Sequence, residues 1–189
     1  MSDPRVVVDL PDWATELERA GEVFGDEASR MRLAITLARV NVERATGGPF
    51  GAAIFESVSG RLVAVGVNSV VRLNQSSLHA EMVAYMRAQA RVGNYTLAAP
   101  SLPTHTLYTS CEPCAMCLGA ALWSGVERLV FAATRDDAIK LRFDEGPVFP
   151  ESYAYLKRRG IDVAGEVLRD EANAVLELYR SRGGIIYNR

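Results

Sequence analysis

Two short stretches decide how this chain is interpreted: His79-Ala80-Glu81 and Pro113-Cys114-Ala115-Met116-Cys117. Apolar periodicity predicts that each of them begins a helix, the first running from Ala80 to about Arg91 and the second from Cys114 to Trp123. A spacing of three residues places both cysteines on one face of a helical turn. Free backbone N–H groups at such a helix end favour the thiolate form of cysteine.

Together these stretches supply a set of metal ligands. His79, Cys114 and Cys117 offer one neutral imidazole and two thiolates, one ligand fewer than a closed tetrahedral zinc site has. The fourth position then stays open to water, as it does in catalytic zinc sites. Zn²⁺ with two thiolates is formally neutral and acidifies water less than an all-histidine site, so a nearby base is useful. Glu81, two residues from the histidine, is predicted to be that base.

The inventory of ligands is small. The chain of 189 residues has three cysteines and two histidines, which excludes modules that bind several zinc ions through nitrogen and sulfur and disfavours a disulfide scaffold. Cys111 makes a second C-x-x-C with Cys114, so a closed site of His79 and three cysteines is an alternative. The proline before Cys114 and the otherwise unused Glu81 favour the open site. Cys111 is then expected to be a buried thiol and His105 a residue of the sheet.

Charge and hydropathy exclude further classes of function. Lys and Arg number 21 against 23 Asp and Glu, a net charge of −2, so no global positive field attracts a nucleic-acid backbone. The N-terminal apolar run, Val6 to Val8, is too short for a signal peptide or a membrane helix. We therefore expect a cytoplasmic protein with no membrane partner and no nucleic-acid partner.

The remaining sequence predicts an α/β domain. Residues 1–25 show little periodicity and are expected to form an N-terminal extension, with a short helix after Pro11. The main domain, residues 26–189, is expected to begin with a helix from the N-cap Asp26 to Gly47. Strands are expected at 52–55, 62–67, 105–109, 128–132 and 161–163, and a last helix at 170–179. This order predicts a mixed sheet with helices on both faces.

The pattern H-x-E…P-C-x-x-C is the signature of zinc-dependent nucleobase deaminases, so residues 26–189 resemble the cytidine deaminase-like superfamily. Within it, the chain is similar to bacterial guanine deaminases. This finer resemblance is carried by Gly48-Pro49-Phe50-Gly51-Ala52, Asn68, Thr109-Ser110-Cys111-Glu112-Pro113-Cys114, Trp123-Ser124-Gly125 and Phe143-Asp144-Glu145-Gly146-Pro147. It implies a three-layer α/β/α sandwich around a mixed sheet of about five strands.

The resemblance also implies the reaction: zinc-dependent hydrolysis of guanine to xanthine and ammonia, extending to related aminated heterocycles such as ammeline. One zinc ion would be held by His79, Cys114 and Cys117. Glu81 would carry a proton from water to the ring of the base, and Glu145 would be a second acidic proton shuttle.

Five further residues would contact the base according to the same resemblance. Asn68 and the backbone of Ala80 would hydrogen-bond it, while Phe50, Trp123 and Phe143 would line the pocket. The residues alone leave other readings open. Asn68 could be a turn residue, Trp123 a core residue, and the pair Asp144-Glu145 an ordinary solvated loop.

Other functions fit parts of the same pattern. A deaminase of guanosine, cytidine or tRNA adenosine would share the zinc motif, although a tRNA enzyme should gather basic residues near its pocket. A zinc-stabilised binding module would need the ligands but not Glu81. Relatives are commonly homodimers, which makes a homodimer the expected assembly. The apolar, glycine-hinged tail Gly183–Arg189 is expected to shield the pocket, either its own or a partner's.

Overall fold

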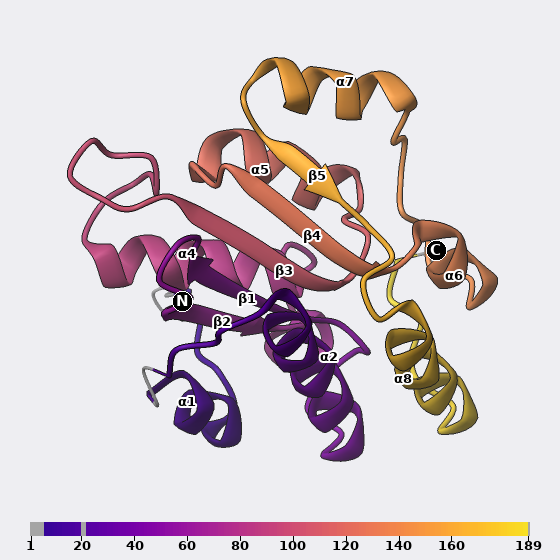
Figure 1. The fold of residues 1–189 in the computed structure, drawn as a ribbon. Helices are drawn as coiled ribbons and strands as arrows, with labels where there is room; N and C mark the ends of the chain where they lie inside the picture. Colours follow the sequence, from indigo (N-terminus) through magenta and orange to yellow (C-terminus); the bar gives the residue numbers. More distant parts are fainter. Residues whose placement is uncertain (1–5, 20–21, 189) are drawn as a thin grey trace, which may run out of the picture.

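A mixed sheet of five strands lies at the centre of the computed structural model, which describes residues 6–19 and 22–188 (Figure 1). Its strand order is β2-β1-β3-β4-β5. The strands are β1 (Gly51–Glu56), β2 (Leu62–Val67), β3 (His105–Cys111), β4 (Arg128–Ala133) and β5 (Asp162–Ala164). β1 is antiparallel to both β2 and β3, whereas β4 is parallel to β3 and β5 is parallel to β4. The predicted mixed sheet of five strands is confirmed.

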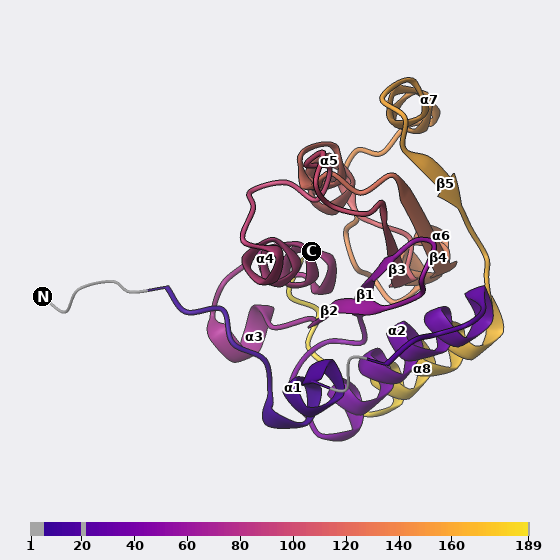
Figure 2. The same cartoon turned by 60° about the vertical axis from the view of Figure 1, so that its left-hand side comes forward.

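Helices cover both faces of this sheet and complete the predicted three-layer sandwich (Figure 2). One layer holds α1 (Asp12–Arg19), α2 (Glu27–Glu43) and α8 (Arg169–Ser181); the other holds α4 (Ala80–Val92) and α5 (Ala115–Ser124). The side chains of β1 alternate accordingly, with Ala53 and Phe55 in the α2 layer and Ala52 and Ile54 in the α4 layer. Three further helices connect these elements: α3 (Val70–Leu73), α6 (Arg135–Lys140) and α7 (Pro150–Arg158).

The ends of the predicted helices follow their capping residues. The Asp26 carboxylate accepts a hydrogen bond from the Ser29 N–H at 2.7 Å, which satisfies one of the free donors at the start of α2. Gly93 ends α4 in the left-handed region at φ 67°, a conformation that glycine adopts without strain. These local signals explain why both helices could be predicted from the sequence.

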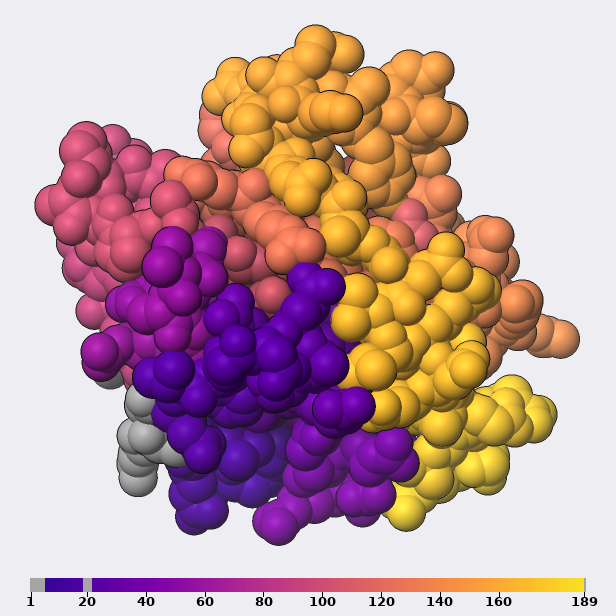
Figure 3. Space-filling view, in the orientation of Figure 1, coloured from indigo at the N-terminus to yellow at the C-terminus, as the bar shows by residue number. Residues whose placement is uncertain are grey.

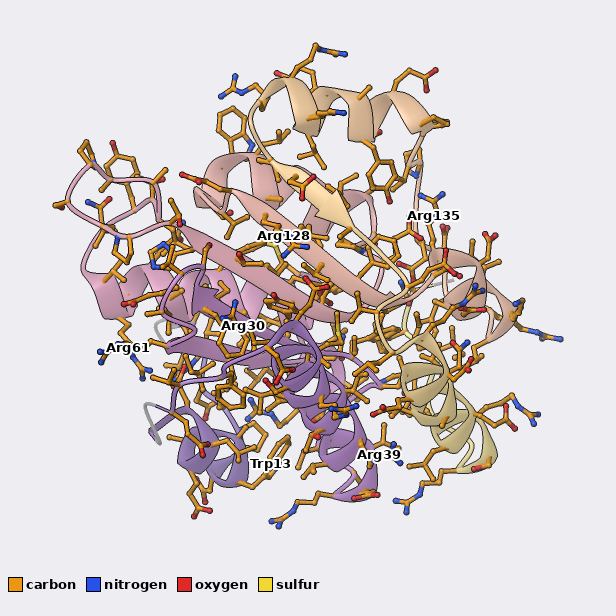
Figure 4. The ribbon with its side chains drawn as sticks, viewed as in Figure 1. Trp13, Arg30, Arg39, Arg61, Arg128 and Arg135 are labelled. Atoms are coloured by element: carbon orange, nitrogen blue, oxygen red, sulfur yellow. The ribbon has the colours of Figure 1, made fainter. Side chains whose placement is uncertain are left out.

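The N-terminal residues pack against the domain. Leu10, Trp13 and Ala14 are buried together with residues of α2, and Trp13 points from α1 toward that helix (Figure 4). Glu18 is 2% exposed, pairs with Arg87 and Arg91 of α4, and accepts the Val65 N–H at the outer edge of β2. In the space-filling view, α1 lies directly against the main body (Figure 3). The domain boundary at residue 25 stays a prediction.

None of the helices in the described part of the chain is long and apolar enough to cross a membrane.

Candidate metal centre and active site

The N-termini of α4 and α5 meet beside the central strands, and this meeting builds the site. His79 is the N-cap of α4 and Cys114 is the N-cap of α5, and neither side chain caps its own helix. Both side chains therefore stay available as ligands. The helix α4 approaches β2 closely at Gly66, where a Cβ atom would lie 2.0 Å from the Ala80 carbonyl oxygen. Glycine is required there for α4 to reach its position.

Three donor atoms converge at this meeting point. The ligand atoms of His79, Cys114 and Cys117 all lie within 4.8 Å of one another, and the Cys114 Sγ lies 3.5 Å from the His79 Nδ1. Usual zinc–sulfur and zinc–nitrogen bond lengths give a sulfur-to-nitrogen edge of about 3.6 Å in a tetrahedron. The donor set and its spacing therefore fit one zinc ion, with Nδ1 as the nitrogen nearest to the cysteine.

The pKa values of the three ligands are shifted in different directions. Hydrogen bonds from Cys117 and His79 lower the pKa of Cys114 to about 4 despite its burial. The pKa of Cys117 is raised, mainly because its thiol forms this hydrogen bond with Cys114 and also because it is buried. Burial lowers the pKa of His79, but the Cys114 hydrogen bond and the nearby acidic groups outweigh it and the net shift is upward. Zinc binding must displace the proton from Cys117, because the thiolate is the form of cysteine that binds the metal.

Two buried carboxylates border the metal ligands. Glu81, at the second position of α4, is 6% exposed, and burial raises its pKa to about 6. Glu145 lies in the loop after α6 and is 7% exposed; burial and the negative charges of Cys114 and Glu81 raise its pKa to about 8. The Ala115 N–H at the start of α5 donates to the Glu145 carbonyl oxygen at 2.9 Å, which fixes this loop beside Cys114. The site can thus hold and move protons near neutral pH.

Unpaired polar atoms mark the space next to these carboxylates. Asn68 is 0% exposed, and both Nδ2 and Oδ1 of its carboxamide have no hydrogen-bond partner among the described residues. The buried Tyr187 hydroxyl has none either. A Cβ atom on Gly48 would lie 2.9 Å from that hydroxyl and 3.1 Å from the Asn68 Oδ1, so the two side chains border the same place. Buried polar atoms without protein partners are costly, so these atoms require a partner from outside the chain, either ordered water or a bound molecule.

Aromatic rings and the C-terminal tail enclose this place. Phe143 contacts Phe50 edge-on at 5.1 Å and Tyr187 at 5.2 Å between ring centroids, and Tyr187 lies 6.2 Å from the His79 ring. Asn188 holds the tail to the loop of Glu145, because its carbonyl oxygen accepts the Asp144 N–H and its Nδ2 donates to the Asp144 carbonyl. The sequence singled out the tail but not Tyr187, whose aromatic ring in a glycine-hinged segment was the available signal.

Trp123 is not brought together with the other predicted residues. Its side chain, in the last turn of α5, is 77% exposed and lies at the surface of the described chain. The backbone of Ala80, by contrast, lies at the start of α4 between His79 and Glu81.

Cys111 and His105 lie outside the group of metal ligands. The buried Cys111 thiol donates to the Thr134 carbonyl oxygen at 3.6 Å, and burial raises its pKa. His105 is 1% exposed in β3, with Nδ1 3.1 Å from the Leu97 carbonyl oxygen. Both have the environments of structural residues.

Glu112 connects the ligand loop to two other elements. Its carboxylate accepts the Arg135 N–H at 2.8 Å, at the start of α6, and the hydroxyl of Tyr153 from α7. Because the segment between α6 and α7 carries Glu145, this carboxylate helps to fix Glu145 relative to Cys114.

Comparison with known proteins agrees with this geometry. Residues 26–133 match the family described as the cytidine and deoxycytidylate deaminase zinc-binding region. The chain belongs to this family. The predicted resemblance to the cytidine deaminase-like superfamily and the predicted zinc cofactor are thereby confirmed.

Two proteins that are similar to this chain are named guanine deaminases. The enzyme of Bacillus subtilis (strain 168) is 39% identical over 121 residues, which are 64% of this chain and 73% of the relative. The solved structure of the Nitrosomonas europaea enzyme is 40% identical, covers 96% of this chain and 99% of its own, and gives a TM-score of 0.91. Another solved structure, of a variant protein in complex with 8-azaguanine, is 40% identical, covers 96% of this chain and 99% of its own, and gives a TM-score of 0.92.

Metal analysis tests the assignment of ligands. The purified wild-type protein is expected to contain about one zinc ion per chain, and Cys114→Ser is expected to lose most of it because a neutral hydroxyl replaces a thiolate. Cys111→Ser is the matched control and should retain the wild-type zinc content. Equal zinc loss in both variants would instead support a closed site with three cysteines.

Proposed function

We propose that this protein is a guanine deaminase that hydrolyses guanine to xanthine and ammonia. The observation that carries the proposal is that two buried carboxyl groups, Glu81 and Glu145, and the buried Asn68 carboxamide, which has no hydrogen-bond partner among the described residues, accompany the metal ligands. This arrangement supplies proton carriers and a polar contact for an uncharged heterocycle in one small site. The guanine deaminases of the two named bacteria support the choice of substrate.

Glu81 is proposed to be the main proton carrier. When bound, zinc would activate a water molecule for attack on the amine-bearing carbon of the base. Glu81 accepts the proton that this water loses and passes it to a ring nitrogen of guanine. Burial raises its pKa to about 6, so its proton affinity is suited to both halves of this transfer at neutral pH.

Glu145 is proposed to protonate the leaving amine. The bond from C2 to nitrogen breaks as ammonia departs, and an unprotonated amide anion would be a very poor leaving group. Burial is the main reason that the pKa of Glu145 is raised to about 8, so Glu145 can give a proton to the amine. It regains a proton from the hydroxyl group at C2, which becomes the carbonyl of xanthine. The charge of Glu81 contributes to this shift, so the two carboxyl groups differ in protonation, which suits a base and an acid.

Asn68 is proposed to recognise the lactam edge of guanine. Its carboxamide carries one acceptor and two donors, and these match the ring N–H and the carbonyl oxygen that guanine presents side by side. Adenine lacks that carbonyl. The hydroxyl of Tyr187 would offer a further hydrogen bond, and the backbone of Ala80 another, while Phe50 and Phe143, whose rings contact each other, would line the pocket.

Several other substrates are less compatible with the site. The tail places Tyr187 over His79, which leaves little access for a tRNA, although tRNA-specific adenosine deaminases share the zinc motif. Ribose would meet the same obstruction in guanosine or cytidine. Ammeline presents a similar aminated edge and is proposed as a side substrate. A screen of ammonia release from guanine, guanosine, adenine, cytidine and ammeline tests this order, and turnover of a nucleoside in preference to guanine would contradict it.

Glu81→Gln separates catalysis from zinc binding. We expect this variant to keep its zinc and to lose about 10²–10⁴-fold in kcat for guanine, because the amide cannot carry the proton. Glu151→Gln, at an exposed position of α7, is the matched control and should retain wild-type turnover. Ammonia release that survives in zinc-loaded Glu81→Gln would leave a binding module or another base as the better explanation.

The C-terminal tail is proposed to close the pocket of its own chain. Asn188 holds it to Asp144, and Tyr187 contacts Phe143 at the site. Deletion of residues 183–189 is expected to lower kcat/KM for guanine by at least about tenfold, since it exposes the site to water and removes the tyrosine. Unchanged kcat/KM in a deletion variant that melts as a folded protein would contradict a role in closure.

A homodimer formed through α5 is the proposed assembly. This helix, Ala115–Ser124, contains no charged residue, yet Met116 is 37% and Trp123 is 77% exposed. An uncharged helix with exposed large side chains is typical of an interface. Trp123→Glu is expected to give a monomer in light scattering. If the wild type is a dimer and the variant has the same mass, this face is excluded as the interface.

The proposed location is the cytoplasm, where all three cysteines would stay reduced. Cell fractionation can check this location.

A further inference from the structure

Asn41 is a polar residue in an apolar position. It lies on α2 and is 0% exposed, whereas the other buried residues of that helix are all apolar: Met31, Leu33, Ala34, Ile35, Leu37, Ala38 and Val42. Burying an amide costs free energy unless its hydrogen-bonding groups find partners. The partners of Asn41 therefore show what this side chain does.

Those partners form hydrogen bonds with both the nitrogen and the oxygen of the amide. The Nδ2 group donates to the carbonyl oxygens of Gly48 at 2.9 Å and Asn68 at 3.0 Å. The Oδ1 atom accepts from the Thr46 hydroxyl at 2.7 Å. Because two carbonyl oxygens can only accept, the nitrogen must face them, and this fixes the orientation of the amide.

The two carbonyl groups belong to the segments that carry proposed substrate contacts. Asn68 also donates its N–H to the Phe50 carbonyl oxygen at 3.0 Å, so its backbone is held on both sides. The fit is close: a Cβ on Gly47 would lie 2.0 Å from the Asn68 carbonyl oxygen and 2.6 Å from the Asn41 Nδ2. One buried amide thus ties the Gly48–Phe50 segment to Asn68.

We infer that Asn41 is a positioning residue for substrate binding, which it affects by fixing the backbone from which the Asn68 carboxamide reaches the base. The inference rests on the proposed function, in which Asn68 binds the lactam edge of guanine. Within the described part of the chain, both polar groups of the Asn68 side chain lack partners, so no hydrogen bond shown there holds this side chain in place. Its direction then depends on the backbone that Asn41 holds. The Asn41 side chain bonds to Gly48, Asn68 and Thr46, none of which lies on α4, so a displacement here acts on the Asn68 carboxamide more than on Glu81.

Asn41→Asp is the isosteric test. It removes both donors and sets carboxylate oxygen against two carbonyl oxygens, so the segment around Asn68 must shift. We expect the KM for guanine to rise about tenfold or more, with a smaller change in kcat and an unchanged zinc content. A KM within about twofold of the wild-type value would overturn the inference, provided that Asn68→Ala raises KM.

Thr46→Val is the matched control. It removes the hydrogen bond to the Asn41 Oδ1 but leaves both Nδ2 bonds, so a general loosening of α2 would appear in it as well. The KM of this variant is expected to stay within about twofold of wild type. Thermal melting is measured for every variant to check that it is folded. If Asn41→Asp fails to fold, Asn41→Ser, which is uncharged and retains one donor, takes its place.

A double-mutant cycle with Asn68→Ala decides between positioning and general structure. If Asn41 acts through Asn68, Asn41→Asp adds little to the KM of a chain that already has Asn68→Ala. An equal rise in KM with and without Asn68 overturns the positioning role while leaving guanine deamination intact. An Asn68→Ala variant with wild-type KM rejects both the Asn68 contact and the inference. Failure of the zinc-loaded wild type to release ammonia from guanine rejects the proposed function itself.

Discussion

The meeting of two helix N-termini is the constraint on which the site depends. His79 begins α4 and Cys114 begins α5, and the three ligand atoms come within 4.8 Å because both helices start at the same end of the central strands. The free N–H groups and the positive dipole ends of the two helices favour the thiolate form of the cysteine ligands there. The close approach of α4 to β2 at Gly66 is part of the same constraint, since a side chain there would push Ala80 and its neighbours away.

A second layer of polar contacts holds the surroundings of this centre. Glu112 connects the loop before Cys114 to α6 and α7, and Asn41 connects the Gly48–Phe50 segment to Asn68. The Glu112 carboxylate binds groups of α6 and α7, and the Asn41 amide binds two loops, one of them 27 residues away in sequence. They explain how loops can present a carboxylate and a carboxamide at fixed places. The side-chain polar groups of Asn68 and Tyr187, which would face the heterocycle, have no partners among the described residues. The backbone that carries Asn68, by contrast, is hydrogen-bonded to Asn41.

The sequence predicted the parts of this account that depend on local signals. The N-cap of α2, the glycine after α4 and the alternating strands are encoded within a few residues, and the zinc ligands lie at the starts of two predictable helices. Tyr187 and Asn41 could not be found in this way, because their roles arise only where the tail and α2 reach Asn68 and Gly48. The exposure of Trp123 was equally hidden, since an apolar helix face has the same pattern in a core and at an interface. The helices α6 and α7 span six and nine residues, which is shorter than the window over which helical periodicity is recognised.

X-ray absorption at the zinc edge of the purified protein tests the central claim, an open site of one imidazole and two thiolates, most directly. The account predicts two sulfur neighbours at about 2.3 Å and two nitrogen or oxygen neighbours at about 2.0–2.2 Å. It also predicts that Cys111→Ser leaves this spectrum unchanged. Three sulfur neighbours, with one lost in Cys111→Ser, would mean a closed structural site and would contradict the account.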